Sequence, residues 1–149
     1  MRVKKINKHK KAFTLIEVLV VIALIGFLAA ITIIAINPAK NFQDARNTQR
    51  RSDVTQILNA VTQYTTQQGN TLSGLGTIST CPTTTNIGTA VGMVNLGTNL
   101  APTYVVAIPN DPSISTVTDT GYDICQTTGG RITVSAPGVE GGGSISVSR

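Results

Sequence analysis

The chain begins with a polar, basic stretch and then becomes strongly apolar. From Ala12 the sequence AFTLIEVLVVIALIGFLAAITIIAI runs to Ile36, and the 19 residues from Val18 onward carry no charge. Apolar side chains would surround such a segment on every side of a helix, so it needs lipid or other helices around it. About 20 apolar helical residues span the hydrocarbon core of a bilayer. The pattern therefore predicts a membrane-length helix with one acid, Glu17, near its start.

Beyond residue 37 the pattern becomes amphipathic. Pro38 removes an intrahelical hydrogen bond, which predicts a kink or a local break in the helix. Apolar residues then recur at spacings of three and four, and Gly69 with Asn70 is a typical helix stop. We therefore expect one broken helix from Phe13 to about Gln68. The apolar face consists of Val54, Ile57, Leu58, Val61 and Tyr64. We expect a solvated face, or ion pairs with another chain, from Asp44, Arg46, Arg50, Arg51 and Asp53.

The second half of the chain has the composition of a small sheet. Gly, Thr, Ser and short β-branched runs follow Gly69, and strands bounded by turn residues are predicted at 103–109, 121–125, 131–137 and 144–149. The last three are joined by Gly-rich turns, which predicts an antiparallel meander, whereas the Thr-rich stretch 77–89 is predicted to be a loop. A sheet packed on the amphipathic helix gives an α+β fold.

Charge is concentrated at the start of the chain. Six of the 12 Lys and Arg residues precede Phe13, and from Phe13 onward six basic residues stand against seven acidic ones, a sum of −1. The net positive charge of the whole chain, +5, therefore gives little support to nucleic-acid binding, and no nucleic-acid site is evident. Basic residues before an apolar span tend to stay in the cytoplasm, which predicts that the C-terminal part lies outside.

Two ordinary interpretations of the apolar segment fit the sequence less well. A cleaved secretory signal has a similar order, with Ala29 and Ala30 as a weak cleavage site, but its apolar region normally spans about 7–15 residues. A plain membrane anchor fits the length but gives Glu17 no role. A charge in hydrocarbon costs about 2.5–3.5 kcal/mol even on lenient scales, so such residues are usually functional.

Residues 11–17, KAFTLIE, followed by the apolar run, resemble the processing site of type IV pilins and type II secretion pseudopilins. The resemblance implies cleavage by a prepilin peptidase between Ala12 and Phe13, and methylation of the new Phe13 amine. The family usually has Gly before the cut, where this chain has Ala12. The implied pilin fold divides the chain into a cytoplasmic leader (1–12), a transmembrane and assembly helix (13–36), its amphipathic continuation (37–68) and a β-rich head (69–149).

Cleavage would supply a charge partner for Glu17. The new amine at Phe13 is positive, and in the family the acid attracts the N-terminal amine of a neighbouring subunit. Opposite charges in apolar surroundings attract far more strongly than in water. The alternative is that the side chain of Glu17 snorkels, so that its carboxylate lies among the cytoplasmic headgroups.

Cys81 and Cys125 are the only cysteines, and both fall on the predicted outer side of the membrane. Disulfides persist in such compartments, so we expect these two residues to be bridged. The pair also loosely resembles the two cysteines that many type IV pilins join around a variable region.

A second, weaker resemblance concerns calcium. The stretch YVVAIPNDPSISTVTDTGYD is similar in outline to the Pro-x-Asp-Pro loop of type II secretion major pseudopilins, although it lacks their Trp-Gly and the Gly-to-Tyr spacing differs. Calcium prefers oxygen ligands, which Asp111, Asp119 and Asp123 offer. The alternative, which we favour, is three solvated aspartates in turns.

The sequence lacks the elements of a familiar catalytic site. The single histidine, His9, lies in the leader, and no phosphate-binding loop occurs. We therefore expect a structural, non-enzymatic subunit that polymerises with copies of itself into a pilus-like filament, served by a prepilin peptidase and an inner-membrane assembly platform, with membrane lipid around it before assembly. Alternatives are a type II secretion pseudopilus subunit and a membrane-anchored minor pilin that binds surfaces or DNA.

Overall fold

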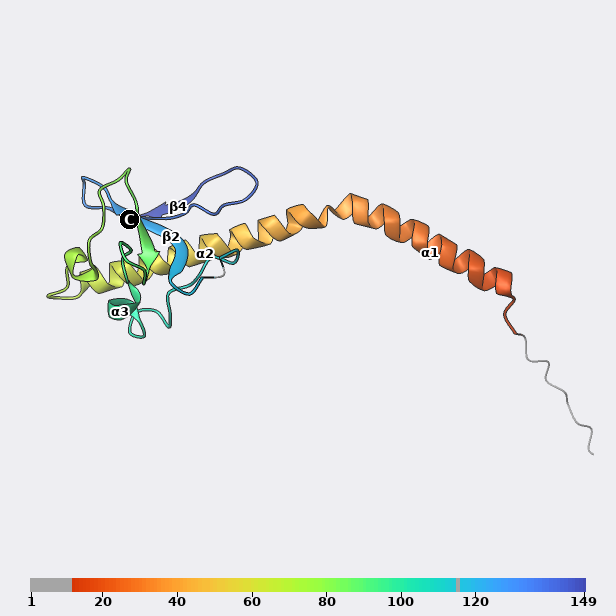
Figure 1. Ribbon diagram of the computed structural model, residues 1–149, viewed down its shortest axis with the longest axis horizontal. Helices are drawn as coiled ribbons and strands as arrows, with labels where there is room; N and C mark the ends of the chain where they lie inside the picture. Colours follow the sequence, from red (N-terminus) through yellow and green to blue (C-terminus); the bar gives the residue numbers. More distant parts are fainter. Residues whose placement is uncertain (1–11, 115) are drawn as a thin grey trace, which may run out of the picture. The chain divides into compact units, whose positions relative to one another are not determined.

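The computed structural model describes residues 12–114 and 116–149. These residues form two compact units that divide at Pro38. The first unit contains the helix α1 (Leu15–Ile36). The second, residues 39–149, is called the C-terminal unit below and contains nearly all of α2 (Pro38–Thr66) and every later element (Figure 1).

The two long helices are separated by a single residue. Asn37 has a left-handed backbone (φ 45°, ψ 71°), a conformation that commonly ends helices and that asparagine tolerates better than most residues. Pro38 then opens α2, at a position where its missing N–H has no helical acceptor to lose. The predicted break is thus observed, and the helices cover Leu15–Ile36 and Pro38–Thr66 rather than the full span expected.

The C-terminal unit has its core between α2 and a sheet. The predicted apolar face of α2 is confirmed, because Val54, Ile57, Leu58 and Val61 are no more than 2% exposed. Full burial of such a side chain contributes about 1.5–3 kcal/mol. The core is completed from the sheet and the connecting segments, chiefly by Ile87, Leu96, Leu100, Tyr122, Ile124 and Val134.

The sheet is antiparallel throughout, with the strand order β1-β2-β3-β4. The strands are β1 (Thr85–Gly88), β2 (Asp119–Gln126), β3 (Ile132–Ala136) and β4 (Ile145–Ser148). The last three are the predicted meander, which is confirmed. The first was missed, because the stretch expected to be a loop contains β1. Its sequence, TNIG, has one aliphatic residue, Ile87, and therefore no alternation to detect.

The strand predicted at residues 103–109 is absent. A short helix, α3 (Gly97–Leu100), precedes this segment, and the N–H groups of Tyr104 and Val105 both donate to the carbonyl of Leu100, at 2.8 and 3.3 Å. A turn has therefore used the donors that a strand ladder would need. The remaining element, the 3₁₀ helix η1 (Leu72–Leu75), follows α2.

The prediction of a solvated charged face on α2 is wrong for two residues. Arg50 is fully buried and Asp53 is 7% exposed, whereas Asp44 and Arg51 are exposed as expected. Arg50 lies four positions before Val54, so it belongs to the same face as the apolar stripe. Its burial requires a partner, which the C-terminal unit supplies.

Candidate functional site

The apolar helix α1 begins with a capping box. Thr14 is the N-cap residue, and its hydroxyl oxygen accepts a hydrogen bond from the backbone N–H of Glu17 at 3.3 Å. In return, Oε2 of Glu17 accepts from the backbone N–H and the hydroxyl of Thr14, each at 2.8 Å. Glu17 therefore uses one carboxylate oxygen to satisfy donors that the start of a helix would otherwise leave unpaired.

This contact was missed in the sequence, where Glu17 has no obvious partner before cleavage. The signal was present, because Thr followed three positions later by Glu, just before an apolar run, is the signature of a capping box. Among the residues that the structure describes, no hydrogen bond reaches the second oxygen of Glu17, Oε1. One oxygen is thus held by the chain itself, and the other is open.

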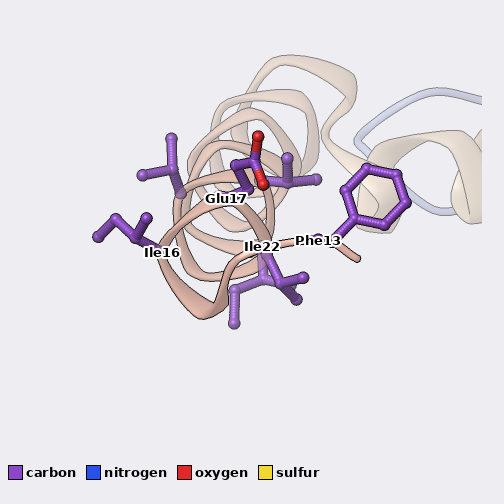
Figure 2. Close-up of a pocket in the computed structure, with 7 residues that line it drawn as sticks. Phe13, Ile16, Glu17 and Ile22 are labelled. Atoms are coloured by element: carbon purple, nitrogen blue, oxygen red, sulfur yellow. The ribbon is translucent and has the colours of Figure 1, made fainter. Parts of the chain in front are cut away.

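The surroundings of Glu17 are apolar and exposed. No residue of α1 is buried, and Phe13, just before it, is 86% exposed. A shallow hollow at the helix start is lined by Phe13, Ile16, Glu17, Val18, Val20, Val21 and Ile22. Figure 2 shows the Glu17 carboxylate projecting from the helix as the only oxygen-bearing side chain of this set. The site is a carboxylate set in an uncovered hydrocarbon surface.

The predicted cleavage junction lies directly before this helix. Ala12 and Phe13 are exposed and have no regular secondary structure, and Thr14 then caps the helix. The rest of the predicted leader, residues 1–11, lies outside the described residues. An exposed, non-helical junction suits cleavage, because a peptidase must bind the backbone on both sides of the bond.

A family model described as the prokaryotic N-terminal methylation motif matches residues 7–36. The chain carries the N-terminal methylation motif of type IV pilins and pseudopilins. The match covers the predicted cleavage junction, the capping box and the whole of α1, and it ends where that helix ends. No curated protein and no solved structure shows significant similarity to the chain.

The apolar helix of this pilin-like chain is long and apolar enough to cross a membrane, and within the described residues it is the one helix that is. Together with the methylation motif, it fits anchoring in the cell envelope. The remaining charged residues of interest lie in the C-terminal unit.

A buried ion pair joins α2 to the loop that follows α3. The Nε of Arg50 donates to Oδ2 of Asp111 at 2.6 Å, and its Nη2 donates to Oδ1 at 2.9 Å. Both side chains are 0% exposed. Burial opposes ionisation of Asp111, but hydrogen bonds from Arg50 and Ser113 outweigh it and hold the pKa of Asp111 below its usual value. The two-pronged geometry and full burial make this pair structural.

A second acid, Glu140, ties the glycine-rich β3–β4 loop to the same stretch of α2. Its carboxylate accepts two hydrogen bonds from Arg46, at 2.6 and 2.5 Å, and two longer ones from Nη1 and Nη2 of Arg50, each at 3.3 Å. Its backbone N–H and C=O both bond to the side chain of Asn47. The hydrogen bonds from Arg46 are the main reason that the pKa of Glu140 is lowered.

The buried acid of α2, Asp53, is satisfied by the sheet. The hydroxyl of Tyr122, on β2, donates to Oδ2 of Asp53 at 2.7 Å. Burial is the main cause that raises the pKa of Tyr122, and the hydrogen bond to Asp53 adds to it. The phenol therefore stays protonated and keeps donating.

The three aspartates considered for calcium do not share a site. Asp111 binds Arg50 with both oxygens, Asp119 accepts from the N–H of Gly121 at 2.8 Å, and Asp123 accepts from the hydroxyl of Thr84 at 3.0 Å. Within residues 12–114 and 116–149, no group of three or more His, Cys, Asp and Glu side chains is placed to hold a metal ion. We therefore build no function on calcium.

The expected disulfide is present. Cys81 and Cys125 are bonded, with an S–S distance of 2.02 Å and a sequence separation of 44. The bridge links the segment before β1 to β2, one of the two inner strands of the sheet. It encloses β1, α3 and the loop with Asp111, the parts of the C-terminal unit with the least regular structure.

Proposed function

We propose that this protein is a structural subunit of a type IV pilus-like filament. A prepilin peptidase cleaves it between Ala12 and Phe13, and the new amine of Phe13 is methylated. An inner-membrane assembly platform then moves α1 from the lipid into a bundle of the same helix from other copies. The C-terminal unit is presented outside the membrane.

The observation that carries the proposal is the uncovered surface of α1, a helix that bears the methylation motif and has no buried residue. A helix that is apolar on all sides must be surrounded by lipid or by other helices. The C-terminal unit has its own closed core, and no residue of α1 is buried. Lipid before assembly and neighbouring copies afterwards satisfy the same surface.

The capping box suggests how Glu17 takes part in assembly. Oε2 is held by Thr14, while Oε1 receives no hydrogen bond from the described residues. The processed chain would bear a positive amine at Phe13, and the amine of a neighbouring copy would bind at Oε1. Leaving either charge unpaired in an apolar bundle is costly, so this pairing would fix how far one helix is shifted along the next.

Mass spectrometry of sheared cell-surface filaments tests the proposal. We expect the filaments to consist chiefly of this chain, starting at N-methylated Phe13. The variant Phe13→Ala keeps the native Ala12 before the cut. The fraction of this variant that is cleaved can be compared with the cleaved fraction of the wild type. Filaments built from chains that retain residues 1–12, or filaments that lack this chain, would contradict the proposal.

A secretion pseudopilus would use the same cleavage and the same helix packing, so it belongs to the same structural class. Deleting the gene and measuring both surface filaments and secreted proteins separates the two. Loss of surface filaments with normal secretion supports the pilus, and the reverse supports the pseudopilus.

A further inference from the structure

The C-terminal unit has an unusual distribution of charge. Residues 54–110 are all described, and these 57 residues contain no Asp, Glu, Lys, Arg or His. Burial does not explain this, because Thr55, Gln56 and Gln63 on α2 and much of the loops around β1 and α3 are exposed. Depletion of charged residues is the compositional mark of the central part of a protein interface.

The net charge of the unit points the same way. Residues 39–149 contain six basic side chains (Lys40, Arg46, Arg50, Arg51, Arg131 and Arg149) and six acidic ones (Asp44, Asp53, Asp111, Asp119, Asp123 and Glu140), which sum to zero. Proteins without net charge do not repel their own copies and associate more readily. The unit is therefore electrostatically suited to close packing with itself.

Three valines of the C-terminal unit are almost fully exposed to solvent. Val91, Val106 and Val117 are 105%, 88% and 92% exposed, far more than aliphatic side chains of the core. They come from three loops that border one hollow beside α3, because Thr89, Ala107 and Val117 all line it. The hollow has a volume of about 300 Å³, and all of its lining residues are uncharged. We call the three valines and this hollow the neutral patch.

We propose that the neutral patch is covered by the C-terminal unit of a second copy of this chain in the filament. This inference rests on the proposed function and adds to it the surface through which neighbouring units meet outside the membrane. Exposed apolar surface beside a hollow is a feature of many interaction sites in folded proteins.

The charge of the patch selects the partner. Nucleic acids and anionic lipid surfaces bind through Lys and Arg, which residues 54–110 lack. A strongly charged protein would lose the hydration of its charges against this patch and receive no opposite charge in return. The chain itself has uncharged, exposed surface outside the patch, on α2 at Thr55, Gln56 and Gln63. A filament contact between copies joins two different surfaces, so the patch need not meet itself.

Photo-crosslinking in cells tests the inference with the full chain. A photoreactive amino acid is placed at Val106 in one strain and at Ser146 in another, where Ser146 is an exposed residue of β4 outside the neutral patch. We expect irradiated filaments to give crosslinked dimers and higher multimers of this chain from position 106 and few from position 146. Mass spectrometry of the product identifies the partner segment.

A charge variant provides the second measurement. Val91→Glu with Val106→Glu should reduce the yield of filaments by about tenfold or more, a change that corresponds to about 1.4 kcal/mol. The amount of processed monomer in the membrane should stay within about twofold, as should filament yield in the control Ser146→Glu. Both valines are exposed, so the substitutions leave the core intact.

The outcomes separate this inference from the proposed function. The inference is overturned if the wild type forms filaments but position 106 gives no crosslink or crosslinks only to a different protein. It is also overturned if the double variant gives a normal filament yield. Each of these results leaves the filament proposal standing. Absence of filaments in the wild type would overturn both.

Discussion

The helix α1 and the C-terminal unit differ in how their charged side chains are paired and buried. In the C-terminal unit, Arg50 and Asp111 are fully buried and bind each other with two hydrogen bonds. In α1, Glu17 stands in an exposed hydrocarbon surface with one oxygen capped by Thr14. The C-terminal unit thus pairs its buried charges within one chain, whereas the proposed partner of Glu17 belongs to a neighbouring copy. Substitutions at these two charged sites should therefore fail in different ways, one in folding and the other in assembly.

The largest effect is expected at Glu17. Glu17→Ala removes the carboxylate that would bind the neighbouring amine, so we expect filament yield to fall by about tenfold or more while membrane-bound monomer is unchanged or increased, because removal of the acid lowers the cost of insertion. Glu17→Gln keeps the shape and loses the charge. Immunoblots of sheared filaments and of membranes measure both quantities.

The matched control for Glu17 is Asp44→Ala, which removes an exposed acid from α2. Its filament yield should remain near that of the wild type. Normal filaments from Glu17→Ala or Glu17→Gln would show that the acid does not set the packing of the helices.

The second effect is expected in folding. Arg50→Met leaves Asp111 as an uncompensated buried charge, which should reduce the free energy of unfolding of the C-terminal unit by about 3–5 kcal/mol. Urea unfolding of the full chain in detergent, followed by the fluorescence of the tyrosines, provides the measurement.

Arg51→Met is the matched control, since Arg51 lies next along the helix but is exposed. Its effect should stay within about 0.5 kcal/mol. The double variant Arg50→Met with Asp111→Leu removes both charges and should recover much of the loss. Equal effects of Arg50→Met and Arg51→Met would refute the structural role of the buried pair.

The third effect concerns the disulfide. Replacing Cys81 and Cys125 together by Ser opens a loop with a sequence separation of 44. The expected loss of unfolding free energy is about 2–4 kcal/mol on the chain-entropy account. The membrane insertion of α1 should be unaffected, because both cysteines lie in the C-terminal unit. Unfolding of oxidised wild type against the double variant tests this, and free thiols in freshly isolated wild-type protein would show that the bridge does not form.

A smaller effect is expected from acid. The pKa values of Asp111 and Glu140 lie below their ordinary values of 3.8 and 4.5 in the folded protein. The unfolded chain therefore binds protons first as pH falls, and the stability from these acids is present above about pH 4.5 and is lost as pH falls through the lower folded pKa values. Urea midpoints measured from pH 7 to pH 3 should decline at the acid end. Glu140→Gln should flatten that decline, and an unchanged profile would contradict the assignment.

The smallest effect is expected at the capping box. Thr14→Ala removes an N-cap, a change that costs about 0.5–2 kcal/mol of helix stability. Thr14→Ser keeps the hydroxyl and should behave like the wild type. Hydrogen exchange of the first amides of α1 in detergent micelles should be faster in Thr14→Ala alone, and equal rates in all three proteins would mean that the cap contributes nothing.

Features with a regular period were predictable from the sequence. The apolar run to Ile36 and the repeat of Val54, Ile57, Leu58 and Val61 depend on local spacing, and the structure contains both helices. The meander β2–β4 was predicted from short β-branched runs joined by Gly-rich turns. Short or irregular elements were not predictable in this way. The strand β1 has one aliphatic residue, and segment 103–109 has strand-like residues whose donors are used by a turn.

The burial of Arg50 could not be predicted from local pattern alone. Its spacing from Val54 places it on the core face of α2, but the partner Asp111 is 61 positions away and lies in an irregular loop. An arginine on that face could equally have ended in solvent at the edge of the core. At the start of α1 the signal was local and was overlooked, since Thr14 and Glu17 stand at the spacing of a capping box.

The charged contacts of α2 have an expected consequence for how the C-terminal unit responds to mechanical force. Arg46 donates hydrogen bonds to the carboxylate of Glu140, 94 positions away, and Arg50 donates to that of Asp111, 61 positions away. Sliding the helix along its axis would have to break both sets of hydrogen bonds at once, since they lie within about one turn of α2. Tension transmitted along α2 would therefore reach the loops around Asp111 and Glu140 through side chains rather than by unwinding the backbone, and the unit should resist shear as one stiff body.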